Sequence, residues 1–165
     1  MDEISRAITL AFIAVISALL TQILLRWDQT RRDTRLRLLE GIRIEQAHFE
    51  RVAYKARHLL LSQIKDGNTK SLARIDEVLF GDVYRESSLV TLCAELDSYG
   101  IPSKEYSVRA HKFRRACLDV VTKALDENGP EEPSNAVEEI KAEIEKMSTQ
   151  TKRMAKNIHH RFSWL

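Results

Sequence analysis

The chain carries one uncharged stretch of nineteen residues, 7–25, which we call the apolar segment. As a helix rising 1.5 Å per residue, the segment is about 28 Å long, close to the roughly 30 Å of a bilayer's hydrocarbon core. A helix in the core of a soluble protein rarely stays apolar on every side over such a length. The sequence therefore predicts a single transmembrane helix, and we assign residues 1–26 to a membrane anchor.

Arginines are distributed unevenly on the two sides of the apolar segment. Only Arg6 precedes it, beside two acidic residues, whereas the residues that follow are rich in arginine. Because positive side chains are retained on the cytoplasmic side, we expect the N-terminus outside and the C-terminus in the cytoplasm. This pattern predicts a single-pass protein of the cell membrane, in a bacterial inner membrane, with the lipid bilayer as its first partner. The expected membrane-interface residues are Arg26, Trp27, Arg31, Arg32, Arg35 and Arg37.

The apolar segment also allows two other interpretations. A cleaved signal peptide needs a positive leading region and small residues at the cleavage point, but here the lead is acidic and Leu24, Leu25 and Arg26 fill the exit. A buried soluble helix is supported only by the scattered polar residues Thr9, Ser17, Thr21 and Gln22. These four residues also fit a contact between membrane helices.

The rest of the chain has the composition of a water-soluble helical domain. Charged residues make up 30% of the protein, and there are only three prolines and five glycines. We expect an all-α fold in which the transmembrane helix continues into a cytoplasmic helical stalk (27–65), followed by a small antiparallel helical bundle (66–126), a linker (127–134) and a C-terminal amphipathic helix (135–165). The predicted apolar stripe of the stalk comprises Leu39, Ile42, Gln46, Phe49, Ala53, Ala56 and Leu60, with Gly41 as a point where the stalk could bend.

Three shorter helices are expected between the stalk and the linker. A turn at residues 66–68 precedes predicted helices at 71–80 and 82–98, the second capped by Asp82 and stopped at Gly100, although the apolar residues of 82–98 also allow a strand. Pro102 and Ser103 are expected to open a stronger helix that ends by Asp126. Its predicted stripe is Tyr106, Ala110, Phe113, Cys117, Val120 and Ala124.

The C-terminal segment has the most regular pattern in the chain. Asn135 and Glu138 have capping-box spacing, and apolar residues then alternate at steps of three and four. This stripe predicts either a coiled coil with a partner or a core-facing surface inside the chain's own bundle. Phe162, Trp164 and Leu165 predict a docking patch or a fold-back onto the bundle. The partner-binding candidates are Ile140, Ile144, Met147, Met154, Ile158, Phe162 and Trp164.

No motif of catalysis, metal binding or nucleotide binding is recognisable, so we expect no cofactor, no small-molecule ligand and no enzyme activity. Glu45 and His48 form one i, i+3 pair, but a di-metal bundle needs two, so we expect a solvated face. His159 and His160 point about 100° apart on a helix, which disfavours shared metal ligation. Cys93 and Cys117 are expected to be reduced core thiols.

A second basic cluster comprises Arg109, His111, Lys112, Arg114 and Arg115. It lacks interleaved aromatic residues and spreads around more than one helical face, so the sequence favours a solvated helix surface over a nucleic-acid interface.

The expected function is that of a non-enzymatic, membrane-tethered helical scaffold that binds a protein partner or self-associates. The alternative is a toxin-like or antiviral effector whose oligomerised spans perturb the bilayer, motivated by the polar residues of the apolar segment.

Overall fold

The computed structural model describes residues 3–66, 75–86, 88–125 and 133–163. These residues form five helices and, within the described ranges, no strand. The all-α prediction is therefore confirmed, and the strand alternative at 82–98 is wrong. The helices are α1 (Glu3–Asp66), α2 (Ile75–Glu86), α3 (Leu89–Ser98), α4 (Lys104–Leu125) and α5 (Pro133–Ser163).

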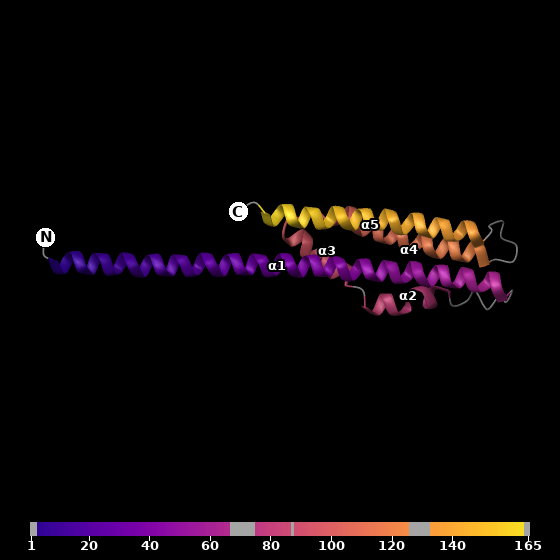
Figure 1. The fold of residues 1–165 in the computed structure, drawn as a ribbon, viewed down its shortest axis with the longest axis horizontal. Helices are drawn as coiled ribbons and strands as arrows, with labels where there is room; N and C mark the ends of the chain where they lie inside the picture. The colour runs from indigo at the N-terminus through magenta and orange to yellow at the C-terminus, as the bar shows by residue number, and fades with distance from the viewer. Residues whose placement is uncertain (1–2, 67–74, 87, 126–132, 164–165) are drawn as a thin grey trace.

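Helix α1 is a single helix of 64 residues, which corresponds to about 96 Å at 1.5 Å per residue. Its N-terminal part projects alone beyond the other helices (Figure 1). All residues from 8 to 30 are exposed, and from residue 8 onward the first buried residue is Thr34. By length and composition α1 is apolar enough to cross a membrane, and its most apolar part is not buried inside the described structure.

The C-terminal half of α1 packs with α4 and α5, and the short helices α2 and α3 lie against α1 and α4. Helix α5 runs antiparallel to both long partners (Figure 1). At the centre, the rings of Phe49 and Phe113 meet edge to face, with centroids 5.5 Å apart and an interplanar angle of 74°. The hydrophobic core is thus built around the second half of α1.

The segment predicted as a helical stalk, 27–65, packs as part of the bundle over most of its length. Five of its seven stripe residues are buried: Ile42, Phe49, Ala53, Ala56 and Leu60. The periodicity located the buried face correctly, but α4 and α5 cover this face from Thr34 onward. Only about two helical turns, residues 26–33, separate the apolar segment from the first buried residue, Thr34.

Gly41 produces no break in α1. A Cβ atom at this position would lie 2.8 Å from Cδ1 of Leu92, which is closer than real Cβ contacts. The missing side chain therefore lets α3 approach α1, and this close approach accounts for the glycine.

The junction between α2 and α3 lies later in the chain than predicted. Gly81, expected between two helices, and Asp82, expected to cap the second, both lie inside α2, and α3 begins after Ser88. A glycine inside a helix costs only about 1 kcal/mol, and the core packing of Leu79 and Phe80 outweighs it. The predicted turn at 66–68 lies largely outside the described residues.

The two long C-terminal helices follow the predicted patterns. In α4, every predicted stripe residue is buried except Ala124, which is partly buried. Helix α5 begins at Pro133, so Asn135 and Glu138 lie within its first turns and not at its boundary. Proline fits the first position of a helix, where its missing N–H leaves no bond unmade.

Candidate functional site

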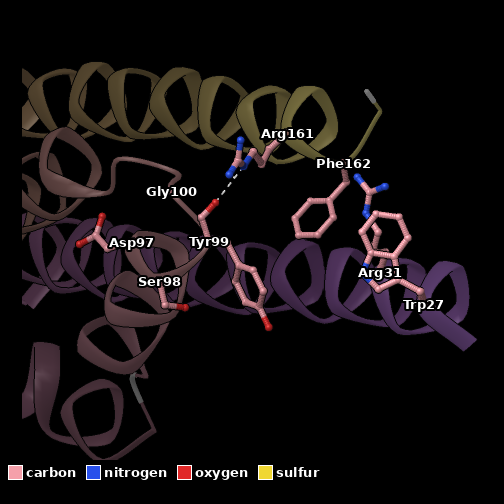
Figure 2. A pocket seen from close by; sticks show the side chains of 8 residues that line it. All are labelled: Trp27, Arg31, Asp97, Ser98, Tyr99, Gly100, Arg161 and Phe162. Atoms are coloured by element: carbon pink, nitrogen blue, oxygen red, sulfur yellow. Dashed lines mark hydrogen bonds between the residues drawn. The ribbon is translucent and has the colours of Figure 1, made fainter. Parts of the chain in front are cut away.

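A pocket of about 680 Å³ lies at the end of the bundle nearest the apolar segment. Figure 2 shows side chains from three parts of the chain converging on it: the start of the packed part of α1, the turn between α3 and α4, and the end of α5. We call it the junction pocket. Its lining residues are Trp27, Arg31, Asp97, Ser98, Tyr99, Gly100, Arg161 and Phe162.

Two arginines supply the positive charge of the junction pocket. The guanidinium of Arg31 lies over the ring of Trp27, 5.0 Å from its centroid. Arg161 donates a hydrogen bond from Nε to the carbonyl oxygen of Tyr99 over 2.9 Å, and its guanidinium lies beside Gly100, on the side of Phe162 away from Trp27 (Figure 2). Among the described residues, neither arginine has a carboxylate within 4.0 Å.

One carboxylate lines the same pocket, but it is already engaged by the backbone turn. Asp97 accepts hydrogen bonds from the backbone N–H of Ser103 at 2.9 Å and from the Ser103 hydroxyl at 3.0 Å. These bonds hold the segment that leads into α4. Asp97 is therefore a structural group of the turn, and two arginines set the sign of the charge on the pocket.

The turn itself depends on Gly100, which has a φ of +70°. Side chains with a Cβ atom rarely adopt this left-handed conformation. The backbone N–H of Ile101 donates to the Leu96 carbonyl oxygen at 3.0 Å, closing the end of α3. Gly100 also lies under Arg161, since a Cβ atom here would lie 3.4 Å from a terminal nitrogen of that arginine.

Aromatic rings form the apolar wall of the junction pocket. Tyr99 and Phe162 lie with ring centroids 5.9 Å apart at 56°, and Trp27 is half exposed on the opposite side. The pocket therefore combines guanidinium groups with apolar surface, an arrangement suited to an anionic amphiphile.

The six predicted interface residues fall into two groups. Trp27 and Arg31 line the junction pocket, and Arg26 is exposed on α1. The other three engage side chains of the protein: Arg32 pairs with Asp28 at 2.8 Å, Arg35 bonds His159 and Arg37 pairs with Glu95.

The predicted partner-binding stripe lies inside the chain's own bundle. Ile140, Met147, Met154 and Ile158 are buried, and Ile144 and Phe162 are partly buried. The structure thus favours the core-facing interpretation of this stripe. Binding of a partner through it stays a prediction that requires α5 to leave the bundle, and Trp164 and Leu165 lie outside the described residues.

The Glu45–His48 pair was predicted to lie on a solvated face, and this prediction is wrong. Glu45 is 0% and His48 4% exposed. The Glu45 carboxylate accepts hydrogen bonds from the backbone N–H of Ser88 at 2.8 Å and from its hydroxyl at 3.3 Å, and His48 Nδ1 lies 3.6 Å from the same oxygen. Glu45 therefore anchors the start of α3 from α1.

The residues of the second basic cluster lie in different surroundings. Arg109 pairs with Glu143, and Arg114 is buried with its guanidinium 6.0 Å from the Phe49 ring. Arg115 lies 3.7 Å from Asp119. The cluster does not form one continuous basic face.

Both cysteines are free and buried. Burial raises the pKa of Cys117 to about 12 and also raises the pKa of Cys93. Thiols of this kind are poor nucleophiles at neutral pH. In the described part of the chain, no group of three His, Cys, Asp or Glu side chains is arranged to hold a metal ion.

Arg161, Tyr99, Asp97 and Gly100 were not identified as site residues from the sequence. Phe162 was, because it extends an apolar stripe to the end of the chain. That the others line one pocket with Arg31 depends on the register between α1 and α5, which no local pattern specifies. No family model matches the chain, and comparisons with curated proteins and with solved structures found no match.

Proposed function

We propose that this protein is a membrane-tethered helical scaffold without enzyme activity. The apolar segment spans the bilayer, and the bundle lies in the cytoplasm and self-associates through an exposed face of α1. The observation that carries the proposal is the contrast within α1: its second half is buried by its own chain, while its first half is exposed on every side.

The apolar segment exposes so much apolar surface that it needs a non-aqueous environment. Its large apolar side chains are 42–67% exposed. Burying one such side chain is worth roughly 1.5–3 kcal/mol, and a soluble protein rarely leaves so many together in water. Lipid hydrocarbon covers such a helix on all sides. The side chains are Ile8, Leu10, Phe12, Ile13, Val15, Ile16, Leu19, Leu20, Ile23, Leu24 and Leu25.

The proposed orientation follows from the arginines after the apolar segment. Retention of positive charge in the cytoplasm favours a cytoplasmic bundle. A reporter protein that is active only in the periplasm, fused after residue 165, is expected to be inactive, and a cytoplasm-dependent reporter at the same place active. Activity of the periplasmic reporter would overturn the orientation.

The proposed surface for self-association is the outer α1 face, defined by Leu36, Tyr54 and Leu61. These side chains are 64%, 69% and 47% exposed. Leu36 and Tyr54 are eighteen residues apart, which is five turns of helix, so they point the same way. A membrane anchor holds two copies parallel, which lets the same face of each α1 meet its counterpart.

Cross-linking of the full chain in native membranes tests this surface. Leu36→Glu with Tyr54→Glu is expected to reduce the cross-linked dimer severalfold, because two like-charged faces then oppose each other. Val90→Glu is the control, since Val90 is 81% exposed but lies on α3. A wild-type protein that remains monomeric would contradict self-association.

The effector alternative has less structural support. The Thr21 hydroxyl donates to the Ser17 carbonyl oxygen of its own helix at 2.8 Å, so it needs no partner from a second span. Growth arrest and dye leakage on expression would favour the effector, and intact membranes would favour the scaffold.

A further inference from the structure

We propose that the junction pocket binds the headgroup of an anionic phospholipid from the leaflet beside the bundle. This inference rests on the membrane anchor proposed above and adds a specific lipid site to it. The arginines after the apolar segment are distributed around α1, whereas the proposed site is one pocket built by three elements of the bundle.

The depth of the pocket matches the headgroup layer. At 1.5 Å per residue, Trp27 lies about 3 Å and Arg31 about 9 Å beyond Leu25 along α1. The polar layer on each side of the hydrocarbon is roughly 5–8 Å thick, and arginine side chains reach along a helix toward it. A lipid whose tails lie beside the apolar segment therefore brings its phosphate to the level of Arg31.

The charges in the pocket select an anion. Among the described residues, Arg31 makes no hydrogen bond or ion pair and lies over the Trp27 ring, and Arg161 uses only Nε in its bond to Tyr99. Guanidinium groups in this state donate charge-assisted hydrogen bonds to phosphate oxygens. Arg161 is exposed and Arg31 half-buried, so both are accessible to a headgroup.

The same pocket offers little to the cationic end of a zwitterionic lipid. Both carboxylate oxygens of Asp97 accept bonds from Ser103, and Arg31 already covers the ring of Trp27. Tyr99 and Phe162 pack against each other and form the apolar wall of the pocket on its bundle side. The expected ligand is thus a phospholipid with a net negative charge, such as phosphatidylglycerol.

Native mass spectrometry of the full chain in mild detergent tests the site. The protein is mixed with phosphatidylglycerol or phosphatidylcholine of identical acyl chains, and the lipid-bound fraction is measured. We expect retention of phosphatidylglycerol to exceed that of phosphatidylcholine by about tenfold or more. Equal retention of the two lipids would overturn the proposal.

Matched variants separate a built site from general attraction of arginine to anionic lipid. Arg31→Gln with Arg161→Gln is expected to lower phosphatidylglycerol binding by about 25-fold, since each arginine contributes on the order of fivefold. Arg32→Gln with Arg153→Gln removes the same charge outside the pocket and is expected to lower binding by less than about threefold. Equal losses in the two double variants would overturn the proposal.

The single variant Arg31→Gln serves as the control for correct folding. Among the described residues, the one polar or ring interaction of Arg31 is with Trp27 of its own helix, so this substitution breaks no polar bond between helices and is still expected to weaken binding by about fivefold. Full competition by millimolar inorganic phosphate would identify a soluble-anion site and contradict the lipid assignment. Failure of the anchor itself is distinguished by membrane fractionation, which does not depend on these arginines.

Discussion

Nε of Arg161, near the end of α5, donates a hydrogen bond to the carbonyl oxygen of Tyr99 over 2.9 Å. This bond joins the last turns of the chain to the turn between α3 and α4. Gly100 lies directly beneath the arginine. The bond therefore fixes the junction pocket at the end of the bundle nearest the apolar segment, and the shape of the pocket depends on the glycine turn.

Substitution of Gly100 by alanine is expected to destabilise the bundle. Its φ of +70° is unfavourable for a residue with a Cβ atom, and the cost is about 1–2 kcal/mol. Thermal unfolding of the full chain in detergent, followed by circular dichroism, measures the loss as a lower Tm.

Gly81→Ala is the matched control for this prediction. Gly81 lies inside α2, where a new Cβ atom meets only Glu77 Cγ at an ordinary 3.6 Å. Alanine is preferred over glycine in helices by about 0.5–1 kcal/mol, so Tm is expected to rise. The same sign for both variants would contradict the assigned role of Gly100.

Replacement of Glu45 by leucine is expected to destabilise the protein through the α2–α3 junction. The backbone N–H of Ser88 loses its acceptor, and an unmade bond of this kind costs about 1–3 kcal/mol. Chemical unfolding of the full chain measures the loss. Glu50→Leu provides the comparison, because Glu50 is exposed and bonds only Gln46 in its own helix. A loss no larger than for Glu50→Leu would show that Glu45 does not anchor α3.

Alkaline pH is expected to destabilise the bundle through its buried thiols. The pKa of Cys117 is raised to about 12 in the folded state from an ordinary value of 9.0. Between these values the unfolded chain loses the proton that the folded chain keeps, so stability falls as pH rises from about 9 toward 12. Below pH 9 both states are protonated, and this effect is absent.

Cys117→Ala checks the assignment by measuring unfolding at pH 8 and pH 10.5. The variant is less stable at both values because it loses packing, but the decrease between them is expected to be smaller than in the wild type. Burial also raises the pKa of Tyr106, so part of the decrease remains. An identical decrease in the two proteins would contradict burial as the cause.

Helical periodicity in the sequence predicted well which residues are buried. It did not predict which helices cover them. The stripes of α4 and α5 were located correctly, and so was the buried face of α1 around Phe49. The sequence could not show that this face packs on α4 and α5, because the covering helices begin about 55 and 84 residues later in the chain.

The polar contacts were the least predictable part of the fold. Glu45 resembles a surface residue in the sequence, and its burial depends on Ser88, forty-three residues away. The junction pocket has the same character, since Arg31 and Arg161 line one pocket only after α5 folds back antiparallel to α1. Only Trp27, Arg31 and Phe162 had local features that identified them beforehand.

The central claim is that residues 7–25 hold the protein in a membrane, and alkaline extraction tests it most directly. After washing at high pH, the full chain is expected to remain in the membrane pellet. Ile16→Arg places a charge at the middle of the span at a cost of about 2.5–3.5 kcal/mol, and it is expected to shift protein to the supernatant. Leu36→Arg, an equal change on the bundle, leaves it in the pellet. Release of the wild-type chain into the supernatant would contradict the account.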